Sequence, residues 1–355
     1  MFKQNSTSSD EVVQSTNDDA TVSRLSAARL GYLEDPFVQY FVKRPQRRMP
    51  IINRGTFMRC HSIDTIVHRF LSMKDMPNKQ IISLGAGFDT RYFMIKSGML
   101  DFGKPSIKGS CKHYFELDFP ENTMKKARII KQKKIFQDLI LQHSEKQEEN
   151  DQKDTDKNNN SKKHEITLER GGTELSGHDY HLIGGDLREW NEQIVDRLLH
   201  YGLDVNAPTL FISECVFIYL PPEHTTHILQ WITQSMAHPL FTLYEQIRPD
   251  DSFGKVMIRN LQDQNIELKG IHAFPTLLHQ ENRFKDLGWD YAKAVTINTL
   301  HDSFLNSENK ARISKLELLD ELEEWILLSD HYCVAWAYKS EKYGHHFNKI
   351  GLIQS

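Results

Sequence analysis

A turn that contains two glycines is the feature of this 355-residue sequence most typical of a ligand site. Gly85 and Gly87 directly follow the short apolar run 80–84, which is typical of a buried strand, and they precede an apolar helical stretch. Glycines at such a turn let the backbone approach a ligand closely and point amide groups at it. Thr90 stands where a dinucleotide site has its third glycine, which disfavours a nicotinamide cofactor and leaves a single nucleoside such as S-adenosylmethionine. An ordinary tight turn would show the same two glycines, so both interpretations remain open on this motif alone.

Acidic residues end the next two strand-like runs. Glu116 and Asp118 close the run 113–118, and Asp186 follows the run 180–183. If the strands are parallel, these acids share one edge of the sheet, where they could accept hydrogen bonds from ribose hydroxyls or an adenine amino group. Glu116 and Asp118 lie on the same face of their strand, so one could bind while the other supports it. Helix capping by Asp118 and a capped loop at Asp186 would explain the same residues equally well.

A lone carboxylate, Glu214, interrupts the apolar run 209–220. Burying a carboxylate is costly unless it meets a cation or hydrogen-bond donors. Because no cationic side chain lies in this run, we expect Glu214 to meet the ammonium group of a cofactor. Tyr219, just before a Pro-Pro turn, could line the same pocket.

Strand-like and helical patterns alternate along most of the chain, and this alternation must position these residues. The strand-like runs are 80–84, 113–118, 180–183, 209–213, 240–244, 293–297 and 331–337, and helical patterns such as 192–200, 224–237 and 315–328 separate most of them. Such an order predicts an α/β fold with a doubly wound, mostly parallel sheet. No repeat with a period of 20–50 residues is present, which disfavours a propeller or a solenoid.

Composition divides the chain into one expected domain and three polar segments. Residues 1–20 are rich in Ser, Asn and Asp and are expected to be a disordered arm. Residues 144–163 contain no apolar side chain and are expected to be a disordered insertion, either a tolerated one or a partner-binding tail. We expect a single domain at 21–340, with a helical lid or N-terminal addition at 21–75, and a tail at 341–355.

Overall composition excludes several classes of protein. A net charge of −4, from 44 basic and 48 acidic residues, gives no bulk attraction to nucleic acid or to an anionic membrane. No apolar run is long enough to span a bilayer, and the N-terminus lacks the pattern of a signal peptide. The 4 cysteines form no C-x-x-C pair, and no H-E-x-x-H, G-x-S-x-G or G-K-[ST] motif occurs. We therefore expect a cytoplasmic, soluble, monomeric protein without a metal site.

Several strings, in order, resemble the leucine carboxyl methyltransferase family, whose members methylate the C-terminal leucine of the protein phosphatase 2A catalytic subunit. They are DPFVQYFV (35–42), INRGTFMR (52–59), LGAGFDT (84–90), YFELDFP (114–120), GDLR (185–188), SECVFIY (213–219), YEQ (244–246) and HYC (331–333). They span most of the chain from about 20 to 340. The resemblance implies a class I S-adenosylmethionine-dependent methyltransferase fold, with a seven-stranded sheet and a helical N-terminal addition.

The resemblance also implies which residues form the site. Carried over by position, the family's cofactor contacts are Arg24, Arg59, Gly85, Asp118, Asp186, Leu187 and Glu214. Arg24 stands where a lysine often occurs, and the guanidinium fork of Arg59 suits the cofactor carboxylate. Arg91, Tyr219 and Tyr244 are the candidates for orienting the substrate.

The implied chemistry agrees with the residues that are missing. A terminal carboxylate has a reference pKa of about 3.3–3.7, so at neutral pH it is already an ionised nucleophile. No general base is needed, and no recognisable catalytic dyad occurs in the sequence. The enzyme must instead align carboxylate oxygen, methyl carbon and sulfonium sulfur for in-line displacement.

Three other interpretations remain. A tRNA-modifying carboxyl methyltransferase of the same family carries a kelch-type propeller, and no such repeats follow residue 340. A nicotinamide-dependent dehydrogenase is disfavoured by Thr90. A non-catalytic phosphatase-binding protein would have lost the cofactor, whereas Gly85, Asp118, Asp186 and Glu214 are all present.

Overall fold

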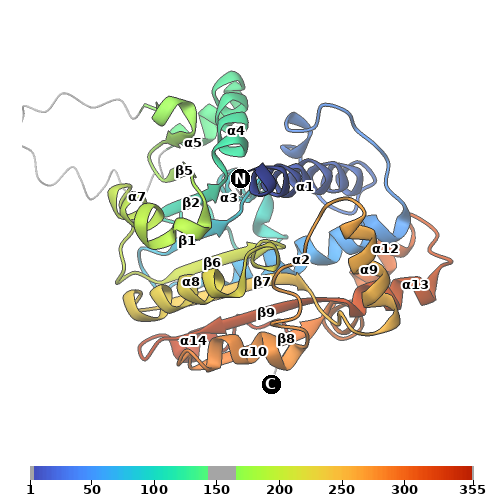
Figure 1. Cartoon of the computed structure of the whole chain (residues 1–355). Coiled ribbons are helices and arrows are strands. Elements are labelled where there is room, and N and C mark those ends of the chain that lie inside the picture. Colours follow the sequence, from blue (N-terminus) through green and yellow to red (C-terminus); the bar gives the residue numbers. More distant parts are fainter. Residues whose placement is uncertain (1–3, 143–164, 354–355) are drawn as a thin grey trace, which may run out of the picture.

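The computed structural model describes residues 4–142 and 165–353, and a mixed sheet forms its centre (Figure 1). Within these residues the sheet has nine strands, in the order β3 (Thr167–Glu169), β4 (Glu174–Ser176), β5 (Tyr180–Gly184), β2 (His113–Asp118), β1 (Gln80–Leu84), β6 (Thr209–Glu214), β7 (Pro239–Gln246), β9 (Tyr332–Tyr338) and β8 (Tyr291–Thr296). Strands β5, β2, β1, β6 and β7 are parallel, whereas β9 is antiparallel to both of its neighbours. This confirms the predicted doubly wound sheet of a class I methyltransferase.

All seven expected strands are present, and two further short strands extend the sheet beyond β5. Strands β3 and β4 have three residues each and form an antiparallel hairpin that pairs with β5. Every side chain of β3 is exposed, and three residues are too few for an alternation of apolar and polar residues to predict a strand.

The register of the central strands places their carboxyl ends at one level. Leu84, the last residue of β1, is paired with Leu117 of β2 and with Ser213 of β6. The residues that follow these three are Gly85, Asp118 and Glu214. The chain order also reverses between β1 and β6, which is where open α/β sheets bind their ligands.

Helices cover both faces of the sheet (Figure 1). Their bounds are α1 (Gln4–Arg29), α2 (Pro50–Ser72), α3 (Arg91–Ser97), α4 (Pro120–Gln132), α5 (Lys134–Leu141), α7 (Val195–His200), α8 (Pro222–Ser235), α9 (Ser252–Gln262), α10 (Leu277–Lys285), α11 (Ile297–Thr299), α12 (Ser307–Ser314), α13 (Leu322–Asp330) and α14 (Gly344–Phe347). Helix α2 and the second half of α1 lie in the range 21–75, where the sequence predicts helices.

Successive residues of the central strands enter two different hydrophobic cores, because side chains alternate across a strand. Ile81 and Leu210 belong to a core that includes residues of α2 and α3, and Ile82 and Phe211 belong to a core that includes residues of α8. All four side chains are fully buried. The sheet is thus fixed from both sides, and its carboxyl edge provides a firm base for a site.

Two expectations about the ends of the chain differ from the structure. Residues 4–20, expected to belong to a disordered arm, form the first part of α1. This segment has no apolar stripe, and polar contacts with the rest of the protein stabilise it, for example an ion pair between Asp10 and Arg188. A helix held in this way has no periodic apolar pattern from which it could be predicted.

The expected tail at 341–355 is largely part of the fold. It contains α14, and Phe347, Ile350 and Leu352 are buried in the larger core. Tyr343 belongs to this core as well, and its spacing to Phe347 and Ile350 is typical of a helix, so the sequence held a signal that the expectation of a tail missed. The predicted insertion at 144–163 lies outside the described residues. Among those that are described, no helix is both long and apolar enough to span a lipid bilayer.

Candidate active site

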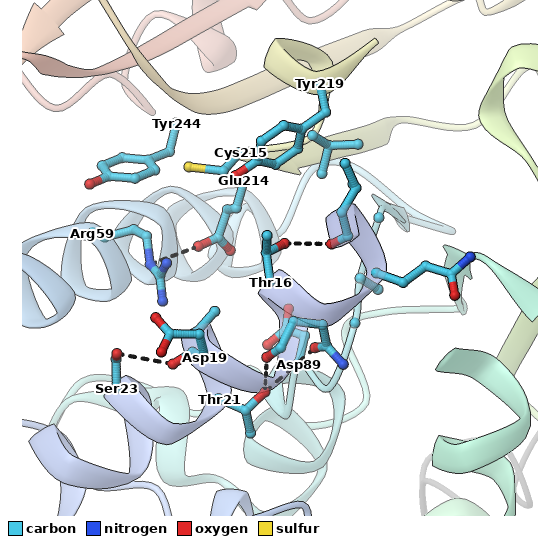
Figure 2. A pocket seen from close by; sticks show the side chains of 18 of the residues that line it. Thr16, Asp19, Thr21, Ser23, Arg59, Asp89, Glu214, Cys215, Tyr219 and Tyr244 are labelled. Carbon is cyan, nitrogen blue, oxygen red and sulfur yellow. Dashed lines mark hydrogen bonds and ion pairs between the residues drawn. The ribbon is translucent and has the colours of Figure 1, made fainter. Parts of the chain in front are cut away.

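A pocket of about 560 Å³ lies at the carboxyl ends of the central strands, with α1 along one side (Figure 2). Its lining includes all ten residues predicted for the site: Arg24, Arg59, Gly85, Arg91, Asp118, Asp186, Leu187, Glu214, Tyr219 and Tyr244. The structure therefore brings these ten together from strands, helices and loops that are distant in the sequence. Their individual roles stay predictions.

The glycine turn after β1 has no room for side chains. Gly85 and Gly87 have positive φ values of 59° and 50°, a conformation that disfavours other residues. A Cβ atom on Gly85 would lie 2.5 Å from a methyl carbon of Val216, and one on Gly87 would lie 2.2 Å from Asn17 Oδ1. The backbone of this turn is thus in direct contact with the pocket and with α1.

Asp118 connects the end of β2 to the glycine turn. Its Oδ2 accepts a hydrogen bond from the Gly87 amide at 2.7 Å, and its Oδ1 accepts from the Phe119 amide and from Asn122 Nδ2, both at 2.8 Å. Burial raises the pKa of Asp118, and these donors oppose that effect. The N-cap of α4 is Phe119, which makes no side-chain cap, so Asp118 is not the helix cap that the sequence also allowed.

Glu116 takes the supporting role among the two acids of β2. Its side chain is fully buried, forms an ion pair with Lys126 and accepts a hydrogen bond of 2.6 Å from the Tyr180 hydroxyl. Lys126 in turn donates to the backbone oxygen of Asp89 at 2.7 Å. Burial raises the pKa of Glu116 to about 7, although Lys126 opposes the rise. Glu116 does not line the pocket. It stabilises the turn through Lys126, which contacts the backbone of Asp89.

Asp186 both lines the pocket and caps a short helical turn. Its side chain accepts a hydrogen bond from the Arg188 amide at 2.9 Å, as the capped-loop interpretation predicts. The Arg188 side chain also pairs with Asp186 and, at 2.7 Å, with Asp10 of α1. The acid after β5 is thus connected to α1 through one arginine.

Glu214 pairs with two arginines from outside its run, which the sequence analysis did not anticipate. Arg91 Nη1 donates to Glu214 Oε1, and Arg59 Nε lies 3.5 Å from Glu214 Oε2. The run 209–220 contains no cation, but α2 and α3 bring these two arginines to it (Figure 2 shows the Arg59 pair). A contact of Glu214 with the cofactor ammonium stays a prediction beside these pairs.

Arg91 is the centre of a buried charge network. Its side chain is 1% exposed and pairs with Asp64 and Asp89 as well as with Glu214. Burial opposes the ionisation of Asp89, but Arg91 and Arg24 outweigh it and lower the pKa of Asp89 to about 2. Arg91 is therefore much less free to move toward a substrate than the sequence suggested.

Arg24 anchors the second half of α1. Its Nε donates to Asp35 Oδ2 at 2.6 Å, and its Nη1 lies 3.9 Å from Asp89 Oδ1. Asp35 also accepts a hydrogen bond of 2.6 Å from Thr90. The aspartate of the string at 35–42 thus links α1 to the residue after the glycine turn.

The lining of the pocket fits S-adenosylmethionine, which carries a sulfonium, an ammonium and a carboxylate. The charged side chains of the lining are of both signs, as such a ligand requires. They are the carboxylates of Asp10, Asp19, Asp89, Asp118, Asp186 and Glu214 and the cationic groups of Arg24, Arg59, Arg91, Arg188 and Lys269. Within the described chain, four buried lining atoms have neither a hydrogen-bond partner nor an ion pair: Asn17 Nδ2, Arg91 Nη2, Asn122 Oδ1 and Gln246 Oε1. Buried polar atoms of this kind need partners, and a polar ligand would supply them.

The two predicted tyrosines line the pocket together with aromatic neighbours. Tyr244 stacks on Tyr332 with a ring separation of 5.2 Å, and the Arg59 guanidinium lies 5.9 Å from the Tyr244 ring. Burial raises the pKa of both Tyr219 and Tyr244. Both phenols are therefore protonated at neutral pH and can donate hydrogen bonds, which agrees with chemistry that needs no base.

Several lining residues were missed from the sequence. They are Asp10, Asn17, Asn122, Gln246, Ile297, Trp325, Leu328 and Tyr332. Gln246 and Tyr332 lie in the strings 244–246 and 331–333, so a signal for them existed. Asp10 and Asn17 lie in the segment 1–20, whose polar composition predicted disorder, so they were not considered as site residues.

Comparisons with known proteins agree on one family. A model of the family described as leucine carboxyl methyltransferase matches residues 6–233. The leucine carboxyl methyltransferase 1 homolog of Arabidopsis thaliana is 40% identical over 92% of this chain and 88% of its own, and leucine carboxyl methyltransferase 1 of Bos taurus is 33% identical over 93% and 90%. The tRNA wybutosine-synthesizing protein 4 of Homo sapiens is 32% identical over 94% of this chain, which covers 45% of that protein.

The family match spans more than half of the sequence and the pocket fits the methyl donor. The chain therefore belongs to the leucine carboxyl methyltransferase family and is a methyltransferase that uses S-adenosylmethionine.

Proposed function

We propose that the protein methylates the α-carboxylate of the C-terminal leucine of the protein phosphatase 2A catalytic subunit, giving a methyl ester. The observation that carries this proposal is that one pocket joins the glycine turn to a wall formed by Ile297, Trp325 and Leu328. A donor on the turn and an apolar side chain against this wall would lie within the same cavity. A leucine suits such a wall, since burying its side chain contributes about 1.5–3 kcal/mol.

At the donor end, S-adenosylmethionine supplies an electrophilic methyl group on a sulfonium sulfur. In this proposal the Gly85 backbone approaches the donor, Asp118 binds ribose hydroxyls, and Asp186 with Leu187 binds the adenine. Arg24 and Arg59 face the donor carboxylate, and Glu214 faces its ammonium. The ion pairs of Arg24 with Asp35, and of Glu214 with Arg59 and Arg91, support this arrangement because they restrain these side chains before the ligand binds.

At the acceptor end, Tyr219 and Tyr244 are proposed to orient the substrate carboxylate by donating hydrogen bonds. Arg91 is proposed to act there in two ways: it holds Glu214 and Asp89, and its Nη2 is a buried donor of the pocket without a partner in the described chain. Because the carboxylate is already ionised, alignment is the main contribution of these residues.

We also propose one methyltransferase domain that works as a cytoplasmic monomer with a protein substrate. A hydrophobic core that includes both Ala27 of α1 and Leu352 near the C-terminus supports one domain. The net charge of −4 supports a protein partner over a nucleic acid.

Methyl transfer from labelled S-adenosylmethionine to the phosphatase catalytic subunit, with and without its final leucine, tests the proposed acceptor. We expect label in the intact subunit and none in the truncated one, and none in a C-terminal peptide whose carboxylate has been converted to an amide. Equal labelling of intact and truncated subunits would refute the leucine as acceptor. Label in added tRNA instead would favour the tRNA-modifying alternative.

A further inference from the structure

The first part of α1 covers the pocket and contacts three different parts of the site. Asp10 pairs with Arg188 after β5, and Asn17 Oδ1 accepts a hydrogen bond of 2.9 Å from the Phe88 amide in the glycine turn. Val12 packs against a small apolar cluster that includes Ile218, after β6. Figure 2 shows this part of α1 crossing the pocket, with Thr16 and Asp19 among the residues that line it.

Asn17 has one amide atom engaged and one free. Its Oδ1 is the acceptor for Phe88, whereas its Nδ2 is buried and has no hydrogen-bond partner in the described chain. The residue lines the pocket, and its side chain lies against Gly87, where a Cβ would be 2.2 Å from Oδ1. A buried amide donor at this point requires an acceptor, and a ligand on the glycine turn can provide one.

The two parts of α1 are held differently. From Thr21 to Leu25 the helix is mostly buried, and Arg24 fixes it to Asp35. Between residues 10 and 20 it is half-buried or exposed and is held by the separate contacts of Asp10, Val12 and Asn17, and by an ion pair of Asp19 with Arg48. Segments with few buried apolar contacts are those that open most easily.

We propose that residues 10–20 form a lid over the methyl donor, and that Asn17 couples closure of the lid to donor binding. In the closed state Asn17 Oδ1 holds the glycine turn while Nδ2 donates to an acceptor atom of the bound donor. This inference rests on the S-adenosylmethionine site and is independent of which carboxylate is methylated. It differs from the lid that the sequence suggested at 21–75, because the moving part precedes Thr21.

Titration calorimetry with S-adenosylhomocysteine tests the role of the amide. Asn17→Ala removes both atoms, whereas Asn17→Asp keeps the acceptor for Phe88 and loses the donor. S-adenosylhomocysteine has no net charge at neutral pH, so the added carboxylate of Asn17→Asp has little long-range effect. We expect both variants to bind about three- to tenfold more weakly than wild type, the loss of about one hydrogen bond. Asp18→Ala, an exposed neighbour outside the pocket lining, is the matched control and should bind as wild type.

Hydrogen exchange supplies a readout other than affinity. In wild type and Asp18→Ala, S-adenosylhomocysteine should slow amide exchange in residues 10–20. In Asn17→Asp at saturating ligand, exchange in this segment should remain faster than in wild type.

The inference would be overturned if Asn17→Asp bound S-adenosylhomocysteine as tightly as wild type. It would also be overturned if ligand did not change the rate of amide exchange in the lid of the wild-type protein. Either result would leave the proposed function intact. Failure of wild type itself to bind S-adenosylhomocysteine would instead overturn the donor site on which both rest. Because Asn17→Asp retains the loop contact, it decides the question even if Asn17→Ala folds poorly.

Discussion

Arg91 is almost completely buried and pairs with three carboxylates, Asp64, Asp89 and Glu214. The charge balance of the pocket therefore depends strongly on this one side chain. Arg59 differs in both respects. Among the described residues its one ion pair is with Glu214, at 3.5 Å, and its side chain is 19% exposed. The first arginine should therefore contribute mainly to folding and the second mainly to binding.

Arg91→Met should lower the free energy of unfolding by about 3–5 kcal/mol, because it leaves buried acids without their cation. Urea denaturation at pH 7.5 measures this change. Arg59→Met is the control and should cost only about 1 kcal/mol, yet weaken binding of S-adenosylhomocysteine. If the two variants were equally stable, the network around Arg91 would not have the importance assigned to it.

Asp118→Ala should weaken S-adenosylhomocysteine binding about 10- to 150-fold, since a hydrogen bond to a charged acceptor contributes about 1.5–3 kcal/mol. Part of the loss will come from the Gly87 amide, which loses its acceptor. Calorimetry measures the affinity. An unchanged affinity would remove Asp118 from the ribose site. The next candidate would be Asn122, whose Oδ1 has no partner in the described chain. Glu116 is a weaker candidate because it already pairs with Lys126.

The identity of the site residues was predictable, but their mutual contacts were not. Gly85, Asp118 and Glu214 follow recognisable strand ends, and the strings around them resemble one family, so position in the sequence was sufficient. The pairing of Glu214 with Arg91 joins residues 123 positions apart. Only the folded chain determines that α3 brings this arginine to β6.

Among the elements, the strands were predictable where they are buried and regular. Strand β1 has five buried residues in a row, whereas β3 has three exposed ones. Helix α1 shows the same limit: its first part is helical because Asp10 and Asn17 find partners elsewhere in the fold, and no local pattern records those partners. Polar tertiary contacts are thus the part of the fold least visible in the sequence.

Strand β5 contains a histidine that should make stability depend on pH. His181 is 5% exposed and stacks on Phe115 of β2 and on Tyr201, and burial lowers its pKa to about 3. The unfolded chain has a histidine pKa of about 6.5, so between pH 6.5 and 3 the unfolded state holds a proton that the folded state lacks. Stability should therefore fall as pH falls through this window, with about 1.4 kcal/mol lost from this group between pH 7.5 and 5.5.

Urea denaturation of wild type and His181→Phe at these two pH values measures that contribution. The phenylalanine variant should lose about 1.4 kcal/mol less than wild type on acidification. Equal losses in the two proteins would mean that His181 titrates normally in the folded state.

On the scale of the whole molecule, the polar segment 144–163 should be dispensable. It contains no apolar side chain with which to join a core, and the flanking elements α5 and β3 end and begin outside it. Replacing it with a short Gly-Ser bridge should leave the melting temperature, S-adenosylhomocysteine binding and methyl transfer within about twofold of wild type, since loop length changes closure entropy only slightly. A tenfold loss of methyl transfer at an unchanged melting temperature would show that the segment docks the substrate.

The level carboxyl ends of β1, β2 and β6 have a consequence for how this chain tolerates changes of length. Gly85, Asp118 and Glu214 each come one residue after a set of paired residues, so their separation is set by the ladder of backbone hydrogen bonds. One residue inserted within any of these three strands would turn every later side chain to the opposite face and move one of the three out of line with the other two. Insertions before the strands, or at the short outer strands β3 and β4, leave that alignment unchanged. Natural and engineered variation in length should therefore collect at the outer edge of the sheet and in its loops, and be absent from the middle three strands.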